Sequence, residues 1–370
     1  DEYLQQSEPQ KREKGYAWQT AIGLQAVDGL KPSEYLIETA RKHIEGDITI
    51  DEVQQLIKSY YDSKDIRTEK DNDKVSANIT KLLNERSFAF TVAGLSAIHR
   101  RIFDGVFKFA GQIRDYNITK KEWVLRGDTV FYVSAPDIRR AIEYDLEQEK
   151  VFDYTGLDIS QIVSHITQFV SGLWQIHPFG EGNTRTTAVF TIQYLRSMGF
   201  NVENDLFANH SWYFRNALVR ANYQNIQKGI KRESVYLERF FRNLLIRENN
   251  ELRNRFMVVN APEDMAISTP TSTPTSTPTS TPTSSNNPLQ IDNENISRLI
   301  KAIANNTLSV KEIMASIGLK NRENFMEYSL NPAMKEGFVS MLYPDKPRHP
   351  RQKYLLTIKG LAVYNSNNLK

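Results

Sequence analysis

The sequence predicts a mainly α-helical protein that ends in a small domain of helices and short strands. Residues 159–176 carry apolar side chains at intervals of three and four, which is the spacing of one helix face. Strand-like runs of β-branched and aromatic residues are short, at 123–133 and 338–357. Thr-Pro-Thr-Ser repeats at 261–288 offer no apolar surface to bury and are typical of a linker. We therefore divide the chain into a helical segment (1–61), a central helical domain (62–260), the linker (261–288) and a C-terminal domain (289–370).

Composition excludes several classes of site. The 370 residues include no cysteine, which rules out disulfides, thiolate nucleophiles and Cys-ligated zinc. The six histidines show no HExxH or similar pairing, so we expect no structural transition metal. No apolar run approaches the roughly 20 residues that span a bilayer, and the polar start lacks a signal-like stretch, so we expect a cytoplasmic protein without a membrane partner. A net charge of +3 gives no indication of nucleic-acid binding by itself.

The N-terminal residues 16–61 predict three helices. Apolar residues recur at helical spacing up to Gly29, which ends the first helix, and an amphipathic stretch follows. Asp51 and Glu52 suit the first turn of the third helix, where carboxylates face the positive end of the helix dipole. The charged residues 62–75 are expected to form a surface connection to the central domain.

Further helices are expected in the central domain, with one hairpin between them. Residues 123–133 carry two β-rich runs separated by Gly127 and Asp128, which predicts a β-hairpin. The predicted helix 159–176 leads directly to His177, and a helix is expected to follow shortly after. The helices expected in this half are 92–103, 135–149, 159–176, 186–198 and 235–245.

The nine residues 177–185 read HPFGEGNTR and have the composition of an anion site. Gly180 and Gly182 carry no Cβ, so the backbone can take positive φ and direct consecutive N–H groups into one concavity at a helix N-terminus. Arg185 offers a forked donor to phosphate oxygens. The chain therefore predicts a phosphate-binding turn that leads into a helix.

The remaining polar residues of this motif suit chemistry on a nucleotide. Asn183 is a neutral donor, and Glu181 is a hard oxygen ligand that can hold Mg²⁺ against a polyphosphate. His177, with an ordinary pKa near 6.5, can accept a proton from an attacking hydroxyl at neutral pH.

This motif resembles the signature of the Fic family, HPFx[D/E]GN[G/K]R. The resemblance implies a Fic-type helical domain with a β-hairpin flap, which transfers AMP from ATP to a hydroxyl of a target protein with the help of Mg²⁺. It implies His177 as general base, Phe179 as an apolar anchor and Glu181 as the Mg²⁺ ligand. The residues that it implies around the nucleotide phosphates are Gly180, Glu181, Gly182, Asn183, Thr184 and Arg185.

Two departures from the signature leave the transferred group open. Thr184 replaces the common Gly or Lys, and Ala188 stands where many members carry a second Arg that holds the far end of the nucleotide. Removal of AMP, or transfer of another phosphate-bearing group, are therefore alternatives.

Residues 24–30 resemble the inhibitory helix motif [S/T]xxxE[G/N] of an antitoxin-like module found in this family. Here Leu24 replaces Ser or Thr, Asp28 replaces Glu, and Gly29 completes the motif. Because Ala188 removes the usual partner of the Glu, we expect residues 16–61 to cover the site but to inhibit weakly or through another contact. A helical hairpin that only packs on the catalytic domain is the alternative.

The resemblance also implies a docking surface for the target and a base pocket. The hairpin would pair with the target's backbone as an extra strand, and a hairpin that only caps the core is the alternative. The residues implied in docking are Val124, Leu125, Gly127, Asp128 and Thr129. The basic and aromatic stretch 212–236 is interpreted as helix packing with a solvated face, and Asn222 and Tyr223 are its candidates for contacts to the base.

The C-terminal domain is interpreted as a winged helix that is tethered to the rest without packing on it. Helices are expected at 296–303, 309–318 and 321–335. Ser309 and Glu312 form the capping box that begins the second of these helices, and Gly318 ends it. Strands at 338–343 and 353–357 would flank a basic wing.

Such modules place the third helix in the DNA major groove and hold phosphates with basic wing residues. Arg322 and Asn324 would lie on the first turn of that helix, and the wing residues that fit are Lys346, Arg348, Arg351 and Lys353. Binding to a protein is the alternative, favoured by the acidic residues Glu312, Glu323, Glu327 and Glu336.

The function predicted from the sequence is therefore that of a protein adenylyltransferase acting on a Ser, Thr or Tyr hydroxyl of a target protein or of itself. A DNA-binding regulator with a nucleotide-sensing site is the second hypothesis. The sequence leaves open whether the chain forms a homodimer.

Overall fold

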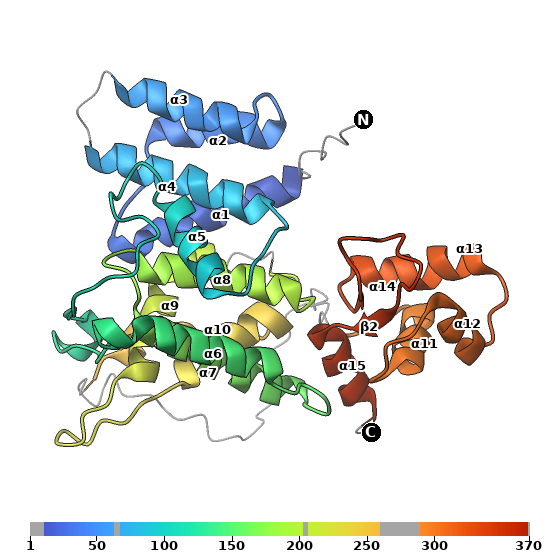
Figure 1. Cartoon of the computed structure of the whole chain (residues 1–370). Helices are drawn as coiled ribbons and strands as arrows, with labels where there is room; N and C mark the ends of the chain where they lie inside the picture. Colours follow the sequence, from blue (N-terminus) through green and yellow to red (C-terminus); the bar gives the residue numbers. More distant parts are fainter. Residues whose placement is uncertain (1–10, 63–66, 203–205, 260–288, 369–370) are drawn as a thin grey trace, which may run out of the picture.

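The computed structural model describes residues 11–62, 67–202, 206–259 and 289–368, and it is mainly helical, as predicted (Figure 1). The predicted linker at 261–288 lies outside these residues. Within the described ranges, no helix is both long and apolar enough to cross a bilayer.

The N-terminal helices lie together at the top of Figure 1. They are α1 (Lys11–Gln25), α2 (Glu34–Glu45), α3 (Ile50–Asp62) and α4 (Arg67–Asn84). A 3₁₀ turn (Ala26–Asp28) follows α1 and ends at Gly29, which takes a left-handed φ of 70°. The α2 helix begins after Ser33, whose side chain accepts a hydrogen bond from the Leu36 N–H.

The prediction of a surface connection at 62–75 was wrong, because most of this stretch belongs to α4. The charged composition was misleading, since Asp73 is buried and accepts hydrogen bonds from the hydroxyls of Ser33 (2.5 Å) and Tyr61 (2.8 Å). An internally paired carboxylate can occupy a helix face that packs against its neighbours.

The α1 helix is part of the main hydrophobic core. Ala17, Ala21 and Leu24 are buried in the same cluster as the central helices. Gly23 contacts the backbone of Ala208 so closely that a Cβ at position 23 would lie 2.3 Å from the Ala208 Cα. Removing the N-terminal segment would therefore expose core surface of the central domain.

The helices that follow α4 in the described part of the central domain surround α8. The capping box of Asp158 and Gln161 starts α7, and α8 buries every residue from 183 to 195. The central helices are α5 (Val92–Ile102), α6 (Ile138–Val151), α7 (Ile159–Ile176), α8 (Asn183–Ser197), α9 (Leu206–Asn222) and α10 (Val235–Ile246).

The predicted β-hairpin at 123–133 is not present. The segment forms a 3₁₀ turn (Trp123–Leu125) and then a loop without strand pairing. Val124 and Leu125 are buried in the main core, and the Val124 carbonyl accepts a hydrogen bond from Val259 N–H at 2.9 Å. The apolar, β-branched composition of this stretch therefore reflects burial rather than strand pairing.

The C-terminal domain has the predicted order of helices and strands, with one addition. The strands pair antiparallel, with Val339 opposite Leu356 and Met341 opposite Tyr354. The third predicted helix includes one π-helical stretch (Met326–Leu330), and the final helix was not predicted. The elements are α11 (Glu294–Ile303), α12 (Val310–Ile317), α13 (Arg322–Phe325), α14 (Asn331–Lys335), β1 (Val339–Met341), β2 (Tyr354–Leu356) and α15 (Ile358–Asn368).

The expectation of a C-terminal domain without packing contacts was wrong. Lys359 N–H donates to the Met198 carbonyl (3.1 Å), and Asn365 donates to a carbonyl in the loop before α7. The backbones of Gly199 and Gly337 approach so closely that a Cβ on Gly199 would lie 2.1 Å from the Gly337 oxygen. Figure 1 shows α15 on the side of this domain that faces the central helices. The C-terminal domain therefore packs against the C-terminal end of α8.

Candidate active site

His177 caps the C-terminus of α7 in a left-handed conformation with φ of 52°. Its side chain is 2% exposed, and its Nδ1 lies 3.2 Å from the Trp174 carbonyl oxygen. Because a carbonyl only accepts, Nδ1 carries the hydrogen in the neutral ring and Nε2 keeps a free lone pair. The Tyr132 ring stacks on the imidazole at a centroid distance of 4.0 Å. Burial, with the charge of Lys120, holds the pKa of His177 well below its usual range, so the ring is neutral at pH 7.

Arg114 fixes the backbone on both sides of this histidine. Its Nε donates to the His177 carbonyl (2.8 Å), and its Nη2 donates to the Val133 carbonyl (2.6 Å). Its own N–H donates to the Pro178 carbonyl at 2.9 Å. The side chain is buried, and sequence reasoning gave it no individual role. Arg114 therefore positions His177.

The loop after His177 is held by side chains that bond to its own backbone. The Asn183 amide accepts from Phe179 N–H (2.9 Å) and donates to the Phe179 carbonyl (2.7 Å). His99, which was not predicted, accepts from Gly111 N–H at Nδ1 and donates from Nε2 to the Glu181 carbonyl at 3.0 Å. Burial lowers the pKa of His99 to about 4, so this ring also stays neutral. The Asn183 side chain thus shapes the loop by pairing with both backbone groups of Phe179.

The two glycines of the loop serve different needs. Gly182 takes a φ of 76° at the start of α8, and a Cβ there would lie 2.2 Å from the Phe103 ring. Gly180 has no positive φ, but its Cβ would lie 2.5 Å from the Tyr116 hydroxyl. Thr184 accepts a hydrogen bond from the Trp174 indole at 3.0 Å and is buried. The predicted phosphate-binding turn is therefore tightly packed, and the donors that it offers to a ligand are the backbone N–H groups at the start of α8.

The Glu181 carboxylate forms an ion pair with a lysine. Lys120 Nζ lies 2.9 Å from Glu181 Oε1. Burial raises the pKa of Glu181, but the charge and hydrogen bond of Lys120, together with the Gly182 N–H and the charge of Arg185, outweigh it and bring the pKa below its ordinary value. Among the described residues no group of three or more His, Cys, Asp or Glu could hold a metal. A carboxylate at the start of the predicted phosphate-binding turn has the chemistry to fit Mg²⁺, which proteins often hold with one carboxylate plus substrate phosphates.

The N-terminal turn reaches directly into this site. Arg185 is 5% exposed, and its Nη2 lies 2.7 Å from the Asp28 carboxylate. Its Nη1 donates to Gln25 Oε1 at 2.8 Å. Asp28 therefore contacts the motif arginine itself rather than position 188, and Gly29 ends the turn that presents it.

A second arginine approaches from α9. Arg215 donates from Nη2 to the Glu122 carboxylate (3.1 Å) and from Nη1 to the Val27 carbonyl (3.1 Å). Its side chain is 18% exposed. Arg215 was interpreted as part of a solvated helix face, and it instead lines the site.

The cavity enclosed by these residues has a volume of about 10 Å³, roughly what one water needs. Two predicted base-pocket residues do not line it. Asn222 is buried and donates to Ser171 and to the Leu218 carbonyl, and Tyr223 donates to the Asp128 carboxylate at 2.6 Å. The lining residues are Val27, Asp28, Lys120, Glu122, Trp174, His177, Glu181, Gly182, Asn183, Thr184, Arg185 and Arg215.

The predicted docking residues divide between core and surface. Val124 and Leu125 are buried, whereas Gly127 is exposed, and Asp128 and Thr129 are half-buried. The loop that follows brings Tyr132 onto His177 and leaves Phe131 81% exposed. The exposed large apolar residues of the segment are thus Trp123 and Phe131, neither of which is among the predicted docking residues.

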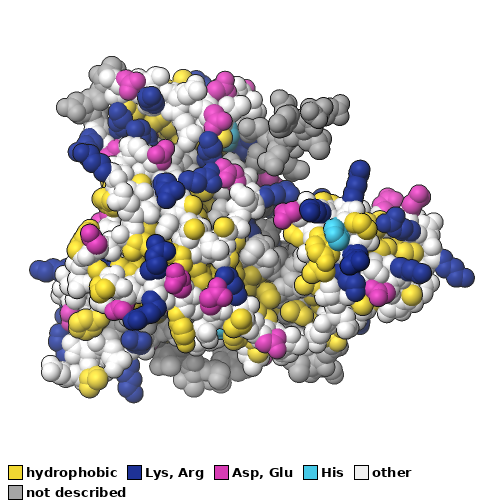
Figure 2. Space-filling view, viewed as in Figure 1, with side chains coloured by type: hydrophobic (Ala, Val, Ile, Leu, Met, Phe, Trp, Pro, Cys, Tyr) yellow, Lys and Arg dark blue, Asp and Glu magenta, His cyan; other side chains and the backbone are white. Residues whose placement is uncertain are grey.

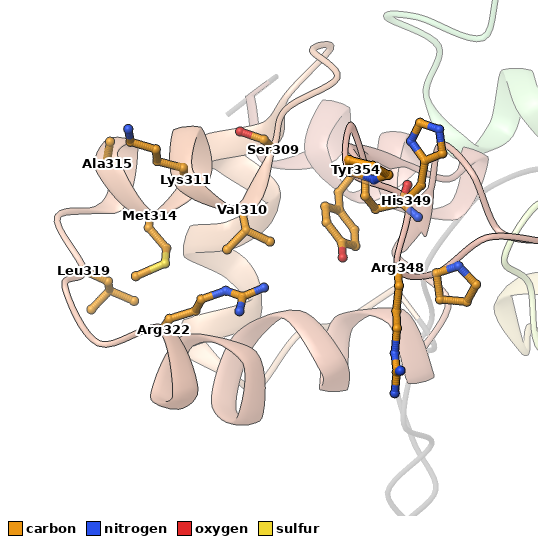
Figure 3. Close-up of a pocket in the computed structure, with 13 residues that line it drawn as sticks. Ser309, Val310, Lys311, Met314, Ala315, Leu319, Arg322, Arg348, His349 and Tyr354 are labelled. Carbon is orange, nitrogen blue, oxygen red and sulfur yellow. The ribbon is translucent and has the colours of Figure 1, made fainter.

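A separate groove lies in the C-terminal domain, with a volume of about 850 Å³. Figure 3 shows Val310, Arg322 and Tyr354 directed into it, with Arg348 on the loop between β1 and β2. Lys311 and His349 also line it, whereas Lys346, Arg351 and Lys353 do not. In Figure 2, Lys and Arg side chains lie beside hydrophobic ones over this domain, with acidic side chains between them.

Comparison with known proteins gives matches in both parts of the chain. Among curated proteins, the chain is similar to the protein adenylyltransferase VbhT of Bartonella schoenbuchensis, at 27% identity over 116 residues that cover 31% of this chain and 23% of that protein. It is also similar to the probable protein adenylyltransferase Fic of Escherichia coli K12, at 25% identity over 120 residues that cover 32% of this chain and 56% of that protein. The chain thus matches only part of the length of either relative.

A solved structure of a Fic family protein from Desulfovibrio desulfuricans G20 aligns with 94% of this chain and 87% of its own, at 17% identity and a TM-score of 0.43. Residues 89–195, which include the HPFGEGNTR motif, match the Fic/DOC family. Residues 294–357 match the C-terminal domain of the Fic-like filamentation-induced-by-cAMP proteins. The chain is therefore built around a Fic/DOC-family domain, to which a Fic-like C-terminal domain is joined.

Proposed function

We propose that this chain is a protein adenylyltransferase, which transfers AMP from ATP to a Ser, Thr or Tyr hydroxyl of a target protein. The observation that carries the proposal is the buried, neutral His177, which lines the same cavity as the N-terminus of α8 and Arg185 and whose Nε2 keeps a lone pair. A proton acceptor and an anion site in one cavity are what a hydroxyl attacking a phosphate requires. The two curated relatives, which are named as adenylyltransferases, support the same reaction.

In this reaction the target oxygen attacks the α-phosphorus of ATP. The bond from that phosphorus to the pyrophosphate leaving group breaks, and His177 Nε2 takes the hydroxyl proton. Arg185 and the backbone N–H groups of Asn183 and Thr184 hold the phosphates and balance the charge that develops on them. Mg²⁺, held by Glu181, would neutralise the phosphate oxygens when bound.

The N-terminal segment acts as an inhibitor in this proposal. Asp28 and Gln25 occupy both terminal nitrogens of Arg185, and the cavity has no room for a nucleotide. Asp28, presented by the turn that Gly29 ends, therefore replaces the contact that Ala188 cannot make. Activity requires this turn to move away from α8.

Intact-mass measurement with labelled ATP tests the proposed transfer. The full chain carrying Asp28→Ala is incubated with Mg²⁺ and with ATP labelled at the α- or the γ-phosphate. AMP transfer, to the chain itself or to an added target, retains the α-label and releases the γ-label as pyrophosphate. Retention of the γ-label would mean phosphate transfer. If neither the chain nor the target retains either label, the proposal is contradicted.

We further propose that the groove of the C-terminal domain binds the phosphate backbone of DNA. The observation that favours it is the set of basic side chains around one groove, at the N-terminus of α13 and on the wing. Each such contact releases counterions, so binding should weaken as salt rises.

Replacing Arg322 and Arg348 together by Ala should weaken DNA binding by about tenfold or more and should flatten its salt dependence by about two phosphate contacts. Fluorescence anisotropy of labelled duplex DNA at several salt concentrations measures both. Substituting Arg298, which is exposed on α11 outside the groove, is the control. Salt-independent binding, or binding that the double substitution leaves unchanged, would contradict the proposal that this groove holds DNA phosphates.

A further inference from the structure

We infer that Arg185 and Arg215 together form a subsite for an outer phosphate group of the nucleotide, and that the Asp28 carboxylate occupies this subsite in the closed state. The inference rests on the proposed function, because it concerns the same cavity. It assigns a binding role to Arg215, which lies on α9, outside the motif that carries Arg185.

The first observation is the position of Asp28 between two guanidinium groups. Its Oδ2 lies 2.7 Å from Arg185 Nη2, and its Oδ1 lies 3.9 Å from Arg215 Nη1. The two oxygens of one carboxylate thus face two different arginines. A tetrahedral phosphate presents oxygens in the same way and carries more charge, so it is a stronger ligand for the same pair.

The second observation is the charge balance of the cavity. Three cations and three carboxylates line it, and the histidine is neutral. When the N-terminal turn leaves, Asp28 takes one of the three negative charges with it. The cavity then holds an excess positive charge in a site with little solvent, which favours the entry of an anion. The charged groups are Lys120, Arg185 and Arg215 against Asp28, Glu122 and Glu181.

The third observation is that both arginines keep donors for a ligand. Arg185 is 5% exposed, and its Nε has no hydrogen-bond partner among the described residues. Arg215 uses Nη2 for Glu122, whereas its Nη1 is directed at Val27 and Asp28, both of which belong to the turn that must move. Glu122 therefore fixes the orientation of Arg215 without using its other terminal nitrogen.

The α8 helix itself supplies only one cation at this end. After Arg185 its next basic residue is Arg196, in the last turn, which donates to the Leu83 carbonyl. Position 188 is a fully buried alanine. A second cation for the outer phosphates must therefore come from another element, and Arg215 is the arginine that already shares an anion with Arg185.

Binding of inorganic pyrophosphate tests this subsite independently of catalysis. The full chain with Asp28→Ala is titrated with pyrophosphate, with ATP and with AMP by calorimetry. Adding Arg215→Gln should weaken pyrophosphate and ATP binding at least about tenfold and AMP binding much less, because AMP lacks the outer phosphates. Arg242→Ala, which removes a surface arginine on α10, is the matched control.

Two further variants separate the subsite from a purely structural role of Arg215. If Arg215 binds the phosphate, Glu122→Gln should tighten pyrophosphate binding, since it frees the Arg215 charge from its buried partner. The double variant Glu122→Gln, Arg215→Gln preserves an uncharged pair of similar size, so it guards against misfolding and should bind pyrophosphate as weakly as Arg215→Gln alone.

The outcomes separate this inference from the proposed function. Pyrophosphate binding that depends on Arg215 in a chain that transfers no AMP would support the subsite and contradict the transferase. Normal AMP transfer with pyrophosphate and ATP affinities that do not change on Arg215→Gln would overturn the subsite and leave the transferase standing.

Discussion

Replacing His177 by Ala should lower the rate of AMP transfer by about 10² to 10⁴-fold, the usual contribution of a general base. The variant should bind Mg²⁺·ATP with nearly unchanged affinity, because the phosphates are held by α8 and the arginines rather than by the imidazole. Transfer rates and ATP titrations in the Asp28→Ala background measure the two effects separately. His210→Ala, on α9, is the matched control, because His210 does not line the cavity.

The pH dependence of the same reaction adds a second constraint. His177 accepts a proton only when neutral, so activity should be retained above its pKa and lost as the pH falls through it. Because burial, followed by the charge of Lys120, lowers this pKa, the acid limb should lie below the ordinary histidine value near 6.5. A rate that instead rises as the pH drops below 6, or an unimpaired His177→Ala variant, would contradict the assignment of the base.

Replacing Asp28 by Ala should raise the rate of AMP transfer by about ten- to a hundredfold. The substitution removes the ion pair at 2.7 Å that ties the N-terminal turn to Arg185, and it leaves that buried guanidinium in need of an anion. Initial rates at a fixed ATP concentration measure the change.

Asp28→Asn and Asp47→Ala refine this experiment. The Asn variant keeps the shape and a hydrogen-bond acceptor but loses the charge, so its rate should lie between wild type and Asp28→Ala. Asp47 is exposed in the same N-terminal segment, and its substitution should change nothing. Equal rates for wild type and Asp28→Ala would show that the turn does not inhibit. Point variants are preferable to deletion of residues 1–61, because α1 belongs to the main core.

The helices were largely predictable, because their signals are local. The spacing of apolar residues in 159–176 and the capping boxes that begin α7 and α12 can be read within a few residues of sequence. The segment 123–133 was predicted incorrectly, since a loop that buries Val124, Leu125 and Val130 has the same composition as a strand. The α4 helix was missed at its start for the opposite reason: its buried Asp73 looks like a surface residue until Ser33 and Tyr61 are placed beside it.

The site was predictable only where the residues are contiguous. HPFGEGNTR placed His177 and Arg185 in one cavity, as expected from a turn that leads into a helix. Arg114, Lys120 and Arg215 come from other parts of the chain, and an isolated basic residue in a sequence carries no signal of a buried partner. The resemblance of 24–30 to an inhibitory motif identified Asp28, but only the fold shows that its partner is Arg185.

The most direct test of the closed site is the affinity of the full chain for Mg²⁺·ATP with and without Asp28, measured by titration calorimetry. If the turn blocks the nucleotide, the apparent affinity of the wild type is reduced by the small fraction of molecules that are open. Asp28→Ala should then bind Mg²⁺·ATP at least about tenfold more tightly than wild type, with Asp47→Ala indistinguishable from wild type. Wild type that binds Mg²⁺·ATP as tightly as Asp28→Ala would show that Asp28 does not close the nucleotide site.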